Sequence, residues 1–237
     1  MRDSRQVLCR GTGGVVIDTH SPGVAAGTAA ALQFGIYESA ERRCVVKRIP
    51  HGIPVIDLGA GIGFISSILA SQMPYGSLLS VEPNPSLHSV LERNVARNAA
   101  PGLHWELLRV AVYVSSGRQG MSISPGGHLG SKLTEPYAPG EGGDDDVPTM
   151  SLDEISEGFD RFGLVSDVEG SEVSFVTGGS KALQRCSWLC IELHSTHADG
   201  RWWSQADLCS EILEKGMSLV HRDGSVFVFE RHSSLAT

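Results

Sequence analysis

The chain has 237 residues, which suits one α/β domain with a sizeable core and is short for two domains. Hydrophobic residues make up 41% and charged residues 19%, which is ordinary for a globular protein. The formal net charge of -8 repels phosphate backbones, so nucleic acid is not an expected partner.

Residues 1–52 predict an N-terminal cap before the main domain. Two short β-like runs, at 7–9 and 15–17, flank several glycines and suggest a hairpin or a cap. A helix is expected within residues 24–48, where Pro50 and Gly52 would end it. Residues 53–237 then form the main domain.

In the main domain, strands alternate with helices. Short apolar runs bounded by turn residues predict strands, at 55–58, 78–81, 103–112, 162–168 and 188–193. Helices are expected in the intervening segments, at 62–73, 84–98, 171–183 and 203–215. Asn84 can cap the second of them, and Ser151 with Glu154 forms a capping box. This alternation predicts a parallel sheet with right-handed crossovers.

Two segments depart from the alternation. Glycine and proline are frequent between residues 117 and 143, which predicts a long loop or irregular insertion at about 115–147. Three aspartates at 144–146 end it, and a solvated loop explains them better than a metal site does. Residues 217–221 and 226–230, split by Asp223 and Gly224, predict a terminal antiparallel hairpin.

The turn after the first strand has a glycine at every second position, namely Gly59, Gly61 and Gly63. Glycine lets the backbone approach a ligand, and the following helix offers free N–H groups. The spacing differs from the G-x-G-x-x-G pattern of dinucleotide sites. Asp57, two residues before the first glycine, suits a cation better than a diphosphate, and S-adenosylmethionine carries both an ammonium and a sulfonium.

Glu82 and Pro83 end the next predicted strand. A carboxylate there can accept hydrogen bonds from a ribose diol, as an acid does in dinucleotide folds. Together with Asp57 and Ala111, these residues predict a nucleoside-type cofactor, which we take to be S-adenosylmethionine. In the alternative, Asp57 and Glu82 only cap adjacent helices.

Asp167 and Glu169 follow the fourth parallel strand, where doubly wound sheets bind their ligands. One of them could act as a general base toward an acceptor hydroxyl, or both could help to hold a divalent cation. In a third interpretation, Asp167 caps the helix that begins near Ser171. His194, at the end of the next strand, is the other candidate base, and a structural histidine fits equally well.

Several segments resemble a known family. VIDLGAGIGFISSILA and VEPNP resemble class I methyltransferases, and VPTMSLDEI, LVSDVEGSE and CIELH resemble the FkbM family of O-methyltransferases, over about residues 37–195. The family's usual Lys-Ile-Asp run is Val165-Ser166-Asp167 here. The resemblance implies a Rossmann-like class I methyltransferase fold, with a mostly parallel seven-stranded sheet and a C-terminal antiparallel hairpin. It further implies S-adenosylmethionine as the cofactor and a hydroxyl of a sugar, polyketide or other small metabolite as the acceptor.

Two other functions stay open. A methyltransferase acting on a nitrogen of a nucleic acid base would often carry N-P-P-Y or D-P-P-Y where this chain has residues 166–169. A cofactor-binding protein without catalysis is the second possibility.

Features of the whole chain favour the cytoplasm. No run approaches the roughly 20 apolar residues of a membrane span, so no membrane contact is expected. The first residues lack the apolar core of a signal peptide. The five cysteines have no regular spacing, which argues against a disulfide framework. The oligomeric state does not follow from the sequence.

Overall fold

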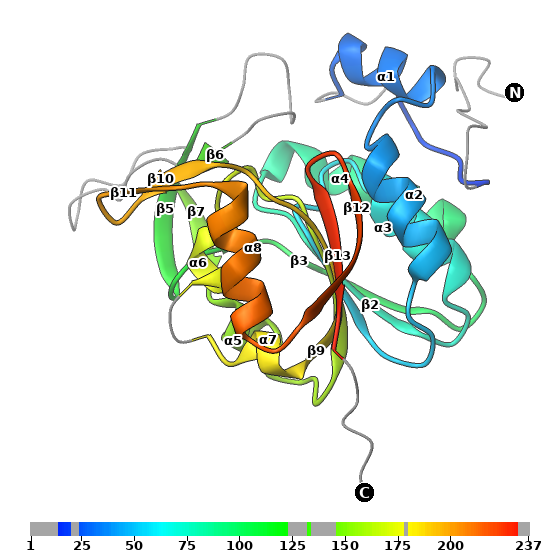
Figure 1. The fold of residues 1–237 in the computed structure, drawn as a ribbon. Coiled ribbons are helices and arrows are strands. Elements are labelled where there is room, and N and C mark those ends of the chain that lie inside the picture. The colour runs from blue at the N-terminus through cyan, green and yellow to red at the C-terminus, as the bar shows by residue number, and fades with distance from the viewer. Residues whose placement is uncertain (1–13, 20–23, 123–131, 134–145, 178–179, 232–237) are drawn as a thin grey trace, which may run out of the picture.

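The computed structural model describes residues 14–19, 24–122, 132–133, 146–177 and 180–231. The strands of its main sheet are β1 (Val55–Leu58), β2 (Ser77–Val81), β3 (His104–Leu108), β8 (Phe162–Ser166), β9 (Cys186–Glu192), β12 (Ser218–Asp223) and β13 (Val226–Glu230). Their order is β12-β13-β9-β8-β1-β2-β3 (Figure 1). The strands from β9 to β3 pair in parallel, whereas β13 pairs antiparallel with both β9 and β12. The predicted fold class, α/β with a mostly parallel seven-stranded sheet and a C-terminal antiparallel hairpin, is confirmed.

Helices cover both faces of this sheet (Figure 1). One face packs against α2 (Ser39–Arg48), α3 (Phe64–Gln72) and α4 (Pro85–Asn98). The other packs against α5 (Leu152–Ile155), α6 (Val173–Val176), α7 (Ala182–Arg185) and α8 (Gln205–Glu214). A further helix, α1 (Ala26–Gln33), precedes α2.

Strand β1 shows how the sheet supplies two separate cores. Its side chains alternate between the faces, so that Val55 joins the core under α3 while Ile56 and Leu58 join the opposite one. All four residues of the strand are buried, as the continuous apolar run predicts for a central parallel strand. Each fully buried aliphatic side chain contributes about 1.5–3 kcal/mol to stability.

The predicted helix starts are confirmed where a local capping pattern specifies them. The side chain of Asn84 accepts a hydrogen bond from the Ser86 backbone N–H at the start of α4, and Pro85 occupies the first turn. Ser151 and Glu154 form the reciprocal capping box at α5. These contacts involve residues only two or three positions apart, so the sequence alone carries them.

The segment around residue 117 differs from its prediction. Strands β4 (Ala111–Val112), β5 (Gly117–Ser122), β6 (Lys132–Leu133) and β7 (Asp146–Met150) form a second sheet in the order β4-β7-β5-β6. The third predicted strand region therefore divides between β3 and β4, and a loop prediction for residues 117–122 was wrong. The pairing of β5 with β7 spans 24 or more residues of sequence, and glycines obscure the alternation that buries Gln119 and Met121. Residues 123–131 and 134–145 of the predicted insertion lie outside the described residues.

Two predicted helices also begin elsewhere. Trp202 and Trp203 belong to β11 (Arg201–Trp203), which pairs with β10 (Thr196–Ala198), and α8 begins only at Gln205. Ser204 caps α8 with its side chain, and Trp203 is buried. The helix expected at 171–183 is present as two single turns, α6 and α7.

The N-terminal segment is extended but forms no strand at residues 15–17. The side chain of Asn98 on α4 pairs with it, accepting a hydrogen bond from the Val16 N–H and donating one to the Val16 carbonyl. The other half of the predicted hairpin, residues 7–9, lies outside the described residues, so a division of the chain near residue 52 stays a proposal. Within the described residues, no helix is long and apolar enough to cross a membrane.

Candidate cofactor and acceptor site

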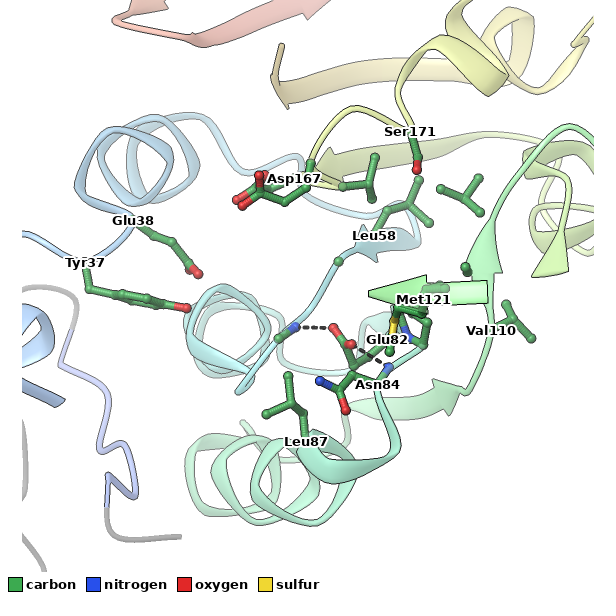
Figure 2. Close-up of a pocket in the computed structure, with 18 residues that line it drawn as sticks. Tyr37, Glu38, Leu58, Glu82, Asn84, Leu87, Val110, Met121, Asp167 and Ser171 are labelled. Atoms are coloured by element: carbon green, nitrogen blue, oxygen red, sulfur yellow. Dashed lines mark hydrogen bonds between the residues drawn. The ribbon is translucent and has the colours of Figure 1, made fainter. Parts of the chain in front are cut away.

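A cavity opens at the carboxyl ends of β1, β2 and β8 (Figure 2). It encloses about 770 Å³ of empty space, part of which is open solvent. Predicted site residues that line it are Gly59, Gly61, Glu82, Pro83, Ala111, Asp167 and Glu169. The other predicted site residues, Asp57, Gly63 and His194, lie outside this lining.

Gly59 is a glycine because another strand end passes against it. Its φ of +79° lies in the left-handed region, and a Cβ there would overlap the backbone carbonyl of Asp167. Its N–H donates to the carbonyl of Val81 at 3.0 Å. The first glycine therefore joins the ends of β1, β2 and β8 at one edge of the cavity.

The third glycine of the turn serves helix packing. Gly63 precedes α3 with a φ of +82°, and a Cβ there would lie 3.3 Å from the backbone of Leu91 on α4. It allows α3 and α4 to approach each other closely, and it does not face the cavity. The expectation that Gly63 contacts the cofactor finds no support in this arrangement.

The carboxylate of Glu82 binds the backbone on two sides, at the glycine turn and before α4. One of its oxygens accepts from the Gly61 N–H at 2.7 Å and the other from the Asn84 N–H at 2.8 Å (Figure 2). A carboxylate has about four acceptor positions, so two remain for the hydroxyls of a ribose. Burial raises the pKa of Glu82 to about 7, although the two backbone hydrogen bonds oppose this rise. Both N–H groups precede α3 and α4, so the alternative in which Glu82 only caps a helix finds no support here.

Asp57 faces α3 and not the cavity. Its carboxylate accepts a hydrogen bond from the hydroxyl of Ser66, which lies 2.7 Å from the hydroxyl of Ser80 on β2. Burial raises the pKa of Asp57 to about 6, and the Ser66 hydrogen bond opposes the rise. This network ties β1, β2 and α3 together beneath the glycine turn. Direct binding of a cationic ligand, which we expected of Asp57, finds no support in this geometry.

The opposite end of the cavity is acidic. Asp167 and Glu169 line it from the segment after β8, and Figure 2 shows Asp167 on the same side as Glu38, away from Glu82. Burial, followed by the charges of Glu192 and Glu169, raises the pKa of Asp167 to about 7. Asp167 caps no helix, since α6 begins at Val173 without a side-chain cap.

His194 lies behind these carboxylates. Its Nδ1 forms a 2.8 Å hydrogen bond with Glu172, whose side chain is fully buried. Its Nε2 lies 3.7 Å from Glu169 and 4.0 Å from both Asp167 and Glu192. Burial lowers the pKa of His194, but the hydrogen bond to Glu172 and the surrounding carboxylates outweigh burial and raise the pKa to about 9. The histidine is therefore charged at neutral pH and is a poor general base in this state.

The connection between α1 and α2 contributes two lining residues that we did not predict individually, Tyr37 and Glu38. The Tyr37 ring packs edge-on against Phe64 of α3, with centroids 5.6 Å apart. Glu38 has a φ of 42°, an uncommon backbone conformation for a residue other than glycine. Burial raises the pKa of Glu38 well above its ordinary value, while a hydrogen bond with Tyr37 opposes the rise. Only the aromatic–acidic pair before a predicted helix could have indicated this position.

Proteins with similar sequence or fold are methyltransferases. A release factor glutamine methyltransferase of Geobacter sulfurreducens is 28% identical over 158 residues, which are 62% of this chain and 48% of that protein. The chain therefore spans about half the length of this curated relative. A TehB-like S-adenosylmethionine-dependent methyltransferase of Corynebacterium glutamicum has a TM-score of 0.40 at 16% identity, covering 81% of this chain and 87% of its own. A precorrin-6y C5,15-methyltransferase of Geobacter metallireducens has a TM-score of 0.46 at 13% identity, covering 83% and 89%.

A family model also matches most of the chain. The model of the methyltransferase FkbM domain matches residues 57–219. That range begins at the end of β1 and reaches β12, so it includes the glycine turn, Glu82 and the acidic segment after β8. The chain belongs to the FkbM methyltransferase family.

Proposed function

We propose that this protein transfers a methyl group from S-adenosylmethionine to a hydroxyl group of a small metabolite such as a sugar or a polyketide. The proposal rests mainly on one observation, namely that the two ends of a single cavity differ in their chemistry. The glycine turn and Glu82 form the end suited to a nucleoside, and Asp167 and Glu169 form the end suited to a hydroxyl that must lose a proton. The four cysteines in the described residues are free thiols, which favours a reducing compartment, and we propose the cytoplasm.

The nucleoside end would bind the cofactor through backbone and carboxylate groups. The carboxylate of Glu82 would accept hydrogen bonds from the ribose hydroxyls. Leu58, Val110 and Met121 supply apolar surface, which suits an adenine ring. The acidic end would face the ammonium and the sulfonium, whose positive charges match those carboxylates.

In the transfer step, the acceptor oxygen attacks the methyl carbon. The new O–CH3 bond forms as the S–CH3 bond breaks, and the electron pair of the broken bond stays on sulfur as a neutral thioether. The hydroxyl proton leaves to one of the two carboxylates that line this end, Asp167 or Glu169. Alignment of oxygen, methyl carbon and sulfur in the cavity supplies much of the rate.

Two features weigh against a nucleic acid base as the acceptor. The segment after β8 is Asp167-Val168-Glu169, which places carboxylates where a phosphate-linked substrate would approach. The net charge of -8 adds to this repulsion.

Methyl-labelled cofactor tests the proposal directly. The full chain and the labelled cofactor would be incubated together with one acceptor class at a time. The acceptor classes are hydroxylated sugars and polyketides, RNA, and a glutamine-containing protein. We expect labelled methyl ether in a small-molecule arm, and a rate about 10²–10⁴ times lower for whichever of Asp167→Asn and Glu169→Gln removes the general base. Asp160→Asn is the control, because Asp160 is exposed before β8. Label in RNA or protein alone, or no binding of S-adenosylhomocysteine, would refute the proposal.

A further inference from the structure

More carboxylates lie at and directly behind the acidic end of the cavity than methyl transfer needs. Four carboxylates, those of Asp167, Glu169, Glu172 and Glu192, lie within 4.0 Å of the His194 ring nitrogens. The one positive charge of the histidine thus faces four carboxyl groups. The bound cofactor would add a net charge of only about one, because its carboxylate cancels its ammonium.

Two buried carboxylate oxygens in this group have no hydrogen-bond partner within the described residues. They are Oε2 of Glu172 and Oδ1 of Asp167. The Glu172 side chain has 0% exposure, so no solvent reaches its oxygen. Leaving such an oxygen unpaired costs about 1–3 kcal/mol, and more when the group is charged. The burial of Glu172 is thus a separate indication that a positive ligand belongs here.

The donor atoms are close enough to bind one ion. One donor atom from each of Asp167, Glu172 and His194 lies within 4.8 Å of the donor atoms of the other two. Ligand atoms lie about 2.0–2.6 Å from a divalent cation, so two of them are at most about 5 Å apart. Nδ1 of His194 and the nearer Glu172 oxygen lie 2.8 Å apart, a separation that two ligands of one ion can have.

We propose that Asp167, Glu172 and His194 bind a divalent cation of the Mn²⁺ or Mg²⁺ class at the acceptor end of the cavity. Carboxylates favour these hard ions, and the imidazole favours Mn²⁺ over Mg²⁺. The ion would partner both unpaired oxygens and take the place of the proton that lies between His194 and Glu172. Glu169 and Glu192 would surround it with further negative charge.

This inference rests on the proposed function, because it gives the cation a task in the same reaction. Asp167 lines the cavity, so an ion bound to it would be open to the acceptor oxygen. Coordination would lower the pKa of the acceptor hydroxyl. The proton would pass to Glu169, and the methyl group would then be transferred to a metal-bound alkoxide, with the same bonds made and broken as above.

Direct binding of Mn²⁺ tests the site without any reaction. The chelator-treated full chain would be titrated with Mn²⁺ in the absence of cofactor, while electron paramagnetic resonance measures the free ion. We expect one saturable site per chain, competition by Mg²⁺, and at least a tenfold weaker affinity for Asp167→Asn and for His194→Gln. Asp160→Asn carries the same chemical change before β8 and should bind Mn²⁺ like the unmodified protein.

S-adenosylhomocysteine binding and thermal unfolding would show that His194→Gln still folds. If the unmodified chain binds no Mn²⁺, or if Asp167→Asn and Asp160→Asn bind it equally well, the cation site is refuted. If the cation site is refuted but the chain still forms labelled methyl ether, the proposed function stands. Saturable Mn²⁺ binding in a chain that methylates only RNA or protein would refute the proposed acceptor and support the ion site.

Discussion

The two buried acids near the glycine turn, Glu82 and Asp57, have different roles. Glu82 holds the glycine turn through Gly61 and still faces the cavity, whereas Asp57, two residues before Gly59, holds α3 through Ser66. Both carboxyls have pKa values raised by burial. Burial therefore does not distinguish them, but depth in the sheet does, because Asp57 lies within β1 beside Ser80, whereas Glu82 follows the end of β2 and lines the cavity.

Cofactor binding should depend on pH through Glu82. Its pKa is raised to about 7, and only the ionised form offers acceptors to both ribose hydroxyls. We expect affinity for S-adenosylhomocysteine to be highest above about pH 8 and to fall below pH 7 by up to about tenfold per pH unit. Isothermal titration calorimetry across this range measures it.

The variant Glu82→Gln should bind about 10–100 times more weakly and lose most of that pH dependence, since a charged hydrogen bond is worth about 1.5–3 kcal/mol. Glu106→Gln, exposed on the neighbouring strand β3, is the control. The stability of the free protein should depend on pH in the opposite direction from cofactor affinity. The raised pKa means that the folded state binds more protons between about pH 4.5 and 7, so the Glu82 contribution to the free energy of unfolding falls as pH rises through that range. A pH profile unchanged in Glu82→Gln would contradict this role.

Gly59→Ala should disturb the cavity most severely of the glycine changes. A methyl group there would overlap the Asp167 carbonyl, and the left-handed backbone costs a residue other than glycine about 1–3 kcal/mol. We expect a decrease of at least that size in the free energy of unfolding by denaturant titration, together with loss of S-adenosylhomocysteine binding. Gly158→Ala is the matched control, because its Cβ would meet no atom within 4 Å. Equal stability of the two variants would show that the glycine turn tolerates a side chain.

At the scale of elements, helix α4 links three parts of the fold. Its N-terminus follows Glu82, and Leu91 packs against Gly63 at the start of α3. Near its C-terminus, Asn98 pairs with the backbone of the N-terminal segment at Val16.

Asn98→Ala should release the N-terminal segment from α4. The change removes two hydrogen bonds to the Val16 backbone, of 2.8 and 2.9 Å, at a cost of about 1–3 kcal/mol. We expect the Val16 amide to exchange with deuterium faster, which mass spectrometry or NMR measures. Arg97→Ala, an exposed change in the same turn of α4, should leave this exchange unaltered. Unchanged protection in Asn98→Ala would mean that other contacts hold the segment.

At the scale of the whole molecule, the outcome of the predictions follows the range of the interactions. The main sheet, α3, α4 and the terminal hairpin were predicted because apolar runs, caps and turn residues act within a few positions of each other. The second sheet was missed because β5 pairs with β7 across 24 or more residues, and no local pattern marks that pairing. The start of α8 is an exception, because Trp202 and Trp203 pair with β10 residues only five and seven positions earlier, in a short hairpin that was not predicted.

The same division applies to the site. The sequence by itself determined the family, the position of the glycine turn and the acids at the ends of β2 and β8, since each is a contiguous motif that a strand end presents. Only the tertiary structure decided that Asp57 and Gly63 turn away from the cavity, that Tyr37 and Glu38 line it, and that His194 lies among four carboxylates. Those facts depend on which elements pack side by side, and packing joins residues more than 100 positions apart in the chain, as it does Glu38 and Asp167.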